Sequence, residues 1–192
     1  LPIEKVGNFC RENNLFFVVD SAQTAGIFPI HMQRMKIDAV AFTGHKGLLG
    51  PQGIGGFVLA EKVIDKIQPL IVGGTGSISH TEKTPPFMPD KFEAGTPNLP
   101  GIIGLAAGVQ WLQEQGMENL RAHELALTQQ FLSGAEVYEQ RGLLKIIGKK
   151  NCCRRTGVVS LALTKGDNAL AADFLARKYG ISVRVGLQCA PN

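Results

Sequence analysis

Apolar residues recur along the first third of the chain with either helical or strand spacing. Residues 3–13 place theirs on one side of a predicted helix. The run Leu15–Val19 is continuously apolar and of strand length, as expected of a strand buried on both faces of a parallel sheet. Further apolar strands are predicted at Ala39–Phe42 and Phe57–Ala60. Strands of this kind with helical patterns between or after them indicate an α/β domain.

A long polar stretch and a change in strand pattern divide the rest of the chain. Gly73–Pro89 is rich in glycine, proline, threonine and serine, has no periodicity and is predicted to be a loop. A predicted helix, Gly101–Gln115, ends at Gly116. Beyond it, helices mix with strands that look antiparallel, so we expect a first domain at residues 1–115 and a smaller α+β domain at 116–192. The elements predicted there are helices at about 118–140 and at 168–179, the latter with an aspartate start at Asp167 and a glycine stop at Gly180, and strands at 144–147, 158–163 and 181–185.

Composition and charge exclude several classes of protein. Hydrophobic residues make up 44% of the 192 positions and charged residues 19%, which is typical of a globular chain and not of a disordered one. The net charge of +4 is mild. The one dense basic cluster, Lys149-Lys150 with Arg154-Arg155, lacks the interleaved aromatic residues of a nucleic-acid surface, which favours a solvated loop. No apolar run reaches the roughly 18 residues that span a bilayer. We therefore expect no nucleic-acid partner and no membrane partner.

The cysteines and histidines form no metal-binding pattern. Cys10, Cys152, Cys153 and Cys189 include no CxxC pair, and the histidines are far apart, with no HExxH sequence. Cys10 lies on an apolar helix face and is expected in the core. Few, unpatterned thiols and the lack of a signal peptide predict a reduced, cytoplasmic protein. Because the sequence starts at Leu1 without a methionine and stops just after an extended segment, we expect a part of a longer protein.

An acid and an amine follow two of the predicted strands. Asp20 comes directly after the first strand, where open α/β sheets place their ligands, and Gln23 lies about one helical turn further on. Lys46 follows the next strand, so the two strands deliver a carboxylate and an amine to one edge of the sheet. A carboxylate beside a heteroaromatic ring nitrogen keeps that nitrogen protonated, and a lysine amine attacks a carbonyl once it loses its proton.

The residues around Lys46 suggest a phosphate group. Thr43, His45 and the backbone amides of a glycine-rich turn are suited to holding one. Each signal has an ordinary alternative: Asp20 as a helix cap, His45-Lys46 as solvated surface, and Gly50–Gly56 as a turn into a strand, because it matches neither the P-loop nor the GxGxxG spacing. Taken in order, the signals fit a phosphorylated aldehyde cofactor.

Four segments resemble one known family. They are VVDSAQTAG (18–26), AFTGHKGLLGPQGIGG (41–56), FEAGTPN (92–98) and RVGLQCAP (184–191), and they are similar to the class V aminotransferases, in particular to the cysteine desulfurase and selenocysteine lyase branch (SufS-like). The resemblance runs along essentially the whole chain. It implies pyridoxal 5'-phosphate (PLP) as cofactor and the PLP-dependent transferase fold type I. Residues 1–115 would be the C-terminal half of the large PLP-binding domain with its linker helix, and 116–192 an incomplete small domain.

The resemblance also implies a role for individual residues. Asp20 would pair with the pyridine nitrogen of PLP, and Gln23 would hydrogen-bond its phenolic oxygen. Lys46 would be the Schiff-base lysine and then a general acid and base. Thr43 and His45 would contact the phosphate of PLP. Thr96 would reach the phosphate of a neighbouring subunit in a homodimer, whereas Thr96-Pro97-Asn98 can also be read as the start signal of the following helix.

A cysteine near the end of the sequence directs the expected chemistry toward sulfur transfer. By the resemblance, Cys189 would attack the sulfur of L-cysteine and become a persulfide, which requires an accessible thiolate. The family also implies a further N-terminal half and a substrate-carboxylate arginine beyond Asn192, for which Arg184 is not an evident replacement. Leu187-Gln188 stands where close desulfurases often carry histidine, a departure that favours the less characterised members of the branch.

Three functions follow as hypotheses. The first is a PLP-dependent cysteine desulfurase that converts L-cysteine to L-alanine, passing sulfur to an acceptor protein. The second is a class V transaminase or selenocysteine lyase that uses the same lysine. The third is a folded but catalytically inert fragment of such an enzyme.

Overall fold

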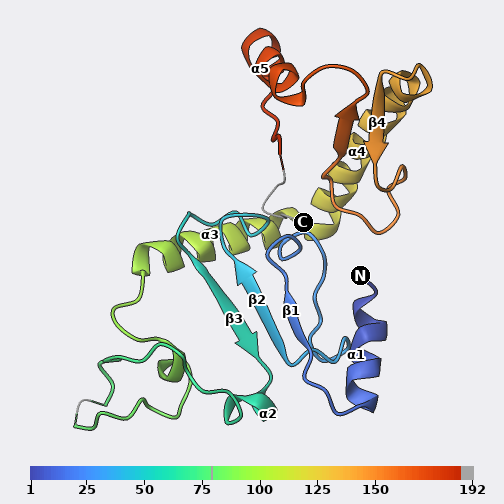
Figure 1. The fold of residues 1–192 in the computed structure, drawn as a ribbon. Coiled ribbons are helices and arrows are strands. Elements are labelled where there is room, and N and C mark those ends of the chain that lie inside the picture. The colour runs from blue at the N-terminus through green and yellow to red at the C-terminus, as the bar shows by residue number, and fades with distance from the viewer. Residues whose placement is uncertain (79, 187–192) are drawn as a thin grey trace. The chain divides into compact units, whose positions relative to one another are not determined.

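The computed structural model describes residues 1–78 and 80–186 (Figure 1). By its internal contacts the chain divides into two compact units, Leu1–Asn119 and Leu120–Asn192. The division falls inside a helix, α4 (Met117–Gln140), whereas the sequence placed the boundary after residue 115. Among the described residues, no helix combines the length and apolar character needed to cross a bilayer.

The first unit is built on a three-stranded sheet in the order β1-β2-β3. β1 (Val18–Asp20) runs parallel to β2 (Ala39–Thr43), with Asp20 opposite Ala41. β3 (Gly55–Leu59) pairs antiparallel with β2, with Gly55 opposite Thr43. The β2–β3 connection contains no helix, and a parallel return would need a longer crossover, so the chain reverses directly. These elements confirm the predicted α/β class of the unit.

α1 (Ile3–Glu12) packs its apolar side against the sheet. Cys10 joins Phe17, Ile37 and Val40 in a buried cluster, which confirms that Cys10 belongs to the core. A Cβ at Gly7 would collide with the backbone carbonyl of Met35, so only glycine allows this close approach of the helix. Burying such side chains provides about 1.5–3 kcal/mol each.

β1 is less buried than its sequence predicted. Val19 packs against the α1 cluster, whereas Phe16 and Val18, which alternate with it, are 59% and 64% exposed. In the described part of the chain β1 is an edge strand packed on one face only, so the expectation of burial on both faces is wrong. A continuous apolar run does not by itself reveal which of its faces another element covers.

Three further elements complete the first unit. α2 (Glu61–Ile64) and the short 3-10 helix η1 (Asp90–Phe92) were not predicted, because each spans only one turn. The described residues of Gly73–Pro89 hold neither helix nor strand, as expected. α3 (Leu99–Gln115) begins two residues before its predicted start, with Asn98 as its N-cap and Gly116 just after its end.

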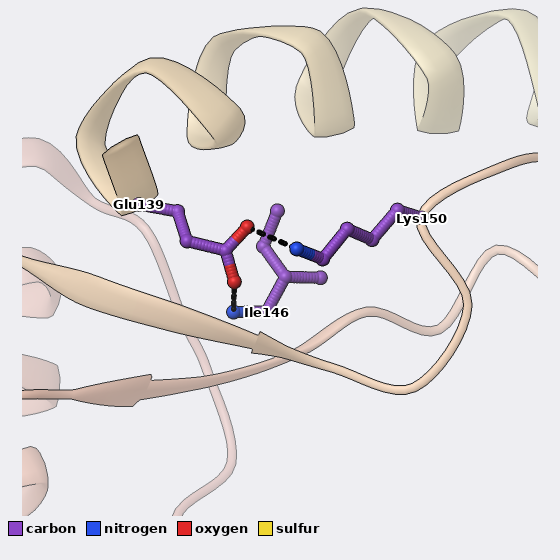
Figure 2. A network of polar contacts seen from close by, with 3 residues as sticks. All are labelled: Glu139, Ile146 and Lys150. Carbon is purple, nitrogen blue, oxygen red and sulfur yellow. Dashed lines mark hydrogen bonds and ion pairs between the residues drawn. The ribbon is translucent and has the colours of Figure 1, made fainter. Parts of the chain in front are cut away.

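The second unit places α4 beside an antiparallel pair, β4 (Leu144–Ile147) and β5 (Ser160–Leu163). Its core contains Leu132 and Ala135 of α4 and Ile146 of β4. Glu139, near the end of α4, accepts hydrogen bonds from the Ile146 amide at 3.0 Å and from the Lys150 amine at 2.6 Å (Figure 2). One carboxylate thus joins the helix, the strand and the loop that follows the strand.

α5 (Asn168–Tyr179) confirms its predicted termini. The Asp167 carboxylate accepts hydrogen bonds from the Ala169 and Leu170 amides, and Gly180 ends the helix in the left-handed conformation. The strand predicted at residues 181–185 is wrong, because this segment is irregular. A strand requires a partner, and among the described residues β4 and β5 pair only with one another.

Candidate functional site

Asp20 lies at the carboxyl end of β1 and is held there by its neighbour. The Ser21 side chain is fully buried, and both its amide and its hydroxyl donate hydrogen bonds of 2.8 Å to the Ala41 carbonyl on β2. The Asp20 carboxylate is exposed, and its Oδ1 accepts a hydrogen bond from the Ala22 amide at 2.9 Å. Among the described residues, its Oδ2 has no hydrogen bond and so is available to a ligand.

Gln23 follows within a tight turn. The Ser21 carbonyl accepts 2.8 Å hydrogen bonds from the Thr24 and Ala25 amides, so residues 21–25 adopt a helix-like turn. Gln23 is exposed within it, three residues after Asp20 and therefore on a similar side. The structure thus brings Gln23 to the same edge of the sheet as Asp20.

Lys46 is presented on a closed loop between β2 and β3. The Gly44 amide donates to the Ile54 carbonyl and the Gly50 amide donates to the Gly44 carbonyl, both at 2.8 Å, which closes the base of the loop. At its tip the Leu49 amide donates to the Lys46 carbonyl at 2.9 Å. Lys46 itself is exposed. The loop therefore presents an exposed amine on a base that two backbone hydrogen bonds close.

Thr43 and His45 interact directly at the base of this loop. The Thr43 hydroxyl lies 3.0 Å from Nδ1 of His45, with donor and acceptor roles set by the histidine tautomer. Both are polar groups next to the closed turn that starts at Gly44. A hydroxyl, an imidazole and nearby amides together are suited to binding a phosphate group.

Two glycines bring the Gln23 turn and the Lys46 loop into backbone contact. A Cβ at Gly26 would collide with the carbonyl of Gly47, and a Cβ at Gly47 would lie 2.5 Å from the carbonyl of Ala25. Together with the pairing of Asp20 and Ala41, this contact gathers the predicted residues Asp20, Gln23, Thr43, His45 and Lys46 at one edge of the sheet. Sequence reasoning missed Ser21, Gly26 and Gly47, although all three lie within segments that it had singled out.

Thr96 is not connected to this group by hydrogen bonds among the described residues. It is exposed in the segment before α3, and no hydrogen bond joins it to the other candidate residues in the described chain. Its neighbour Asn98 accepts a hydrogen bond from the Gly101 amide at 3.1 Å and donates to the Gly53 carbonyl at 3.4 Å. The helix-start interpretation of this segment is therefore confirmed at Asn98.

The remaining candidates belong to the second unit. Cys189 and Leu187-Gln188 lie outside the described residues, and Arg184 is exposed in the irregular segment after α5. Cys152 is half-buried and donates to the Leu125 carbonyl, while Cys153 is exposed. In the basic cluster, Arg155 donates hydrogen bonds to the carbonyls of Lys149, Thr156 and Val158 and so organises its own loop.

Comparison with known proteins identifies the family. The profile of the class-V aminotransferases matches residues 1–192, the whole chain. The chain belongs to this family.

Among the described residues, no group of three histidine, cysteine, aspartate or glutamate side chains is placed to hold a metal ion.

Two similar proteins are named cysteine desulfurases, and a third is described with a PLP cofactor. A "probable cysteine desulfurase" of Pyrococcus abyssi is 35% identical over 98% of the chain and 46% of its own length. The apo structure of a cysteine desulfurase from Thermococcus onnurineus aligns with TM-score 0.81 and 32% identity, over 98% of this chain and 46% of that one. A structure of a Lys→Ala mutant of C-DES, described with glycine covalently linked to its PLP cofactor, aligns with TM-score 0.75 and 26% identity, over 96% of this chain and 49% of that one.

These matches confirm the expected fold type, the PLP-dependent transferase fold type I. They also show that the chain spans just under half the length of the proteins that it resembles.

Proposed function

We propose that the chain is the part of a PLP-dependent cysteine desulfurase that carries the cofactor lysine and the sulfur-accepting cysteine. The observation that carries the proposal is the gathering of Asp20, Gln23 and Lys46 at one sheet edge, through the β1–β2 register and the Gly26–Gly47 contact. Residues 1–115 would be the C-terminal half of the large PLP-binding domain with its linker helix, and 116–192 an incomplete small domain. The names of the related proteins support the same activity.

The described residues fit PLP as a cofactor. Asp20 offers a carboxylate oxygen that has no other hydrogen bond in the described chain, as a protonated ring nitrogen requires. Thr43 and His45 offer polar groups for the phosphate next to a closed glycine turn. When bound, PLP supplies a conjugated ring that accepts the electron pair released at the substrate's Cα.

Each residue then has a defined task. Asp20 would keep the ring nitrogen protonated, and Gln23 would orient the ring through its phenolic oxygen. The Lys46 amine would hold the cofactor through its aldehyde and would move a proton from the substrate's Cα to the product. Thr96 would contact the phosphate across a homodimer interface.

Cys189 supplies the sulfur chemistry. Its thiolate attacks the sulfur of the bound L-cysteine, and the carbon–sulfur bond of the substrate breaks. The new sulfur–sulfur bond leaves a persulfide on Cys189, and the carbon skeleton, after protonation, leaves as L-alanine. A thiolate of a sulfur-acceptor protein would then attack the outer sulfur of the persulfide, so that the persulfide bond on Cys189 breaks, the sulfur passes to the acceptor and Cys189 is released as a thiolate for the next turnover. An accessible thiolate is the requirement that Cys189 must satisfy.

Titration with PLP tests the cofactor assignment. We expect the complete protein to develop the visible absorption band of a lysine-bound cofactor, and Lys46→Ala to abolish it. Lys165→Ala changes a lysine of the second unit that is also exposed and should leave the band intact. Borohydride reduction followed by peptide mass spectrometry should place the cofactor on Lys46. A band that survives Lys46→Ala refutes the assignment.

The same titration on the 192-residue chain separates an active part from an inert fragment. If the complete protein shows the band and the 192-residue chain does not, this chain is a folded fragment without a complete site. Cys189→Ala separates the enzymes. Loss of alanine production from L-cysteine supports a desulfurase, whereas retained transamination or selenocysteine cleavage beside that loss identifies the second candidate. Cys153→Ala, which removes an exposed thiol, is the control.

A further inference from the structure

Lys46 has to be placed relative to Asp20 and Gln23, although it follows them by 26 and 23 residues in the sequence. The β1–β2 pairing ends at Asp20 and Ala41, so it fixes the strands and not the loops beyond them. The hydrogen bonds that close the base of the Lys46 loop likewise join only residues between β2 and β3, namely Gly44, Gly50 and Ile54. A separate contact between the loops is needed to set the position of the amine.

Gly26 and Gly47 form that contact. Gly47 directly follows Lys46, and its carbonyl occupies the space that a side chain at Gly26 would need. In return, a side chain at Gly47 would meet the carbonyl of Ala25 at 2.5 Å and the side chain of Ile27 at 2.9 Å. Two backbones touch here without any side chain between them. Because backbone atoms cannot swing aside as a side chain can, this distance is set firmly.

A second glycine, Gly108 of α3, also lies close to the backbone of the Lys46 loop. A Cβ at Gly108 of α3 would lie 2.6 Å from the carbonyl of Leu48 and 3.0 Å from the carbonyl carbon of Leu49. The Lys46 loop is therefore in close backbone contact both with the turn at residues 21–25 and its continuation to Gly26 and with α3. Ser21, buried and bonded twice to Ala41, prevents the turn from moving.

We propose that Gly26 and Gly47 are positioning residues for Lys46, because their backbone contact sets how closely the amine approaches Asp20 and Gln23. This inference rests on the proposed PLP site. A methyl group at either position forces the loop outward and moves the amine away from the cofactor that Asp20 and Gln23 orient. Misplacement on the order of 1 Å costs about a hundredfold in a well-aligned reaction, and we expect PLP affinity to fall by at least about tenfold.

Gly26→Ala in the complete protein is the first test, with Gly53→Ala as its matched control. Both glycines have positive φ, 82° and 78°, so both substitutions introduce similar backbone strain. Only Gly26 has a neighbour that a methyl group would meet, because nothing lies within 4 Å of a Cβ at Gly53. Gly47→Ala adds a variant without positive φ, in which the clash acts alone.

Two measurements decide the outcome. Hydrogen exchange of the Leu49 and Gly50 amides reports on the Lys46 loop without any cofactor, and it should accelerate in Gly26→Ala although residue 26 is distant in sequence. PLP titration and borohydride trapping on Lys46 should weaken in Gly26→Ala and Gly47→Ala, and remain as in wild type in Gly53→Ala. Circular dichroism checks that each variant is folded.

Several results would overturn the inference. The first is amide exchange and PLP affinity in Gly26→Ala that equal those of the wild type. The second is a loss of PLP affinity that is as large in Gly53→Ala as in Gly26→Ala. The third is failure of both Gly26→Ala and Gly47→Ala to fold, which would make the contact a folding requirement. Failure of the proposed function looks different. In that case the wild-type protein takes up no PLP, and the exchange of Leu49 and Gly50 alone decides whether the glycine contact holds the loop.

Discussion

A buried carboxylate at the amino end of β2 is expected to stabilise the first unit. Asp38 is 3% exposed, and its Oδ2 accepts a hydrogen bond from the Phe17 amide at 2.9 Å. Its Oδ1 forms an ion pair with Lys62, the residue after the first position of α2. One side chain thus connects the start of β1, the start of β2 and α2. We predict that replacing Asp38 destabilises this unit measurably.

The magnitude follows from the two interactions. Asp38→Asn keeps an acceptor for Phe17 but turns a charged hydrogen bond into a neutral one, a loss of about 1 kcal/mol. It also removes an ion pair whose lysine side chain is 49% exposed, and such pairs contribute no more than about 1 kcal/mol. The free energy of unfolding should fall by about 1–2 kcal/mol. Asp38→Ala also leaves the Phe17 amide without its acceptor, which raises the loss to about 2–4 kcal/mol.

Urea unfolding followed by tryptophan fluorescence measures the loss in free energy of unfolding of the first unit. Trp111, the only tryptophan of the chain, lies in α3 of the first unit, and both tyrosines, Tyr138 and Tyr179, lie in the second. A double-mutant cycle with Lys62→Met isolates the ion pair and should give a coupling of up to about 1 kcal/mol. Equal or greater stability of Asp38→Asn would refute the reasoning, because desolvation of the carboxylate would then outweigh its contacts.

The pH dependence provides an independent check. Burial opposes ionisation of Asp38, but Lys62, the Phe17 amide and Arg11 outweigh it and lower the pKa below its ordinary value of 3.8. A lowered pKa in the folded state means that the stabilisation is present above the unfolded value and is lost as pH falls through the folded one. The difference between wild type and Asp38→Asn should therefore be constant near neutral pH and shrink below about pH 4. A difference that grows on acidification would contradict the assignment.

Three further predictions concern other elements. The Lys150 amine and the Ile146 amide lower the pKa of Glu139, so Glu139→Gln should destabilise the second unit at neutral pH. The difference in free energy of unfolding between wild type and variant should disappear in acid, and tyrosine fluorescence during urea unfolding measures it. Leu132→Ala empties a site only 2% exposed and should cost about 2–5 kcal/mol in the same assay; an unchanged midpoint would show that this core is not formed. Asn98→Ala removes the α3 cap and should cost about 1 kcal/mol by tryptophan fluorescence, with Ser instead of Ala restoring most of it.

Much of the local structure was predictable from sequence. The amphipathic spacing of residues 3–13 predicted α1, and Asp167 with Gly180 correctly marked both ends of α5, because capping depends on side chains within one turn of the helix. The order of Asp20, Gln23, Thr43, His45 and Lys46 also predicted that these residues lie at one edge of the sheet, since polar residues after neighbouring parallel strands meet there. The helix predictions use only short-range information, and the site prediction adds only that the two strands are neighbours in one parallel sheet.

Tertiary structure alone decided the features that depend on distant partners. Leu15–Val19 looked like a strand buried on both faces, yet only the positions of α1 and β2 show that Phe16 and Val18 are exposed. Residues 181–185 had strand character but no partner to pair with in the described chain. Gly26 and Gly47 looked like ordinary turn residues until the two loops were seen in contact. Sequence patterns report the preferences of a segment, whereas burial, pairing and backbone contact are properties of two segments together.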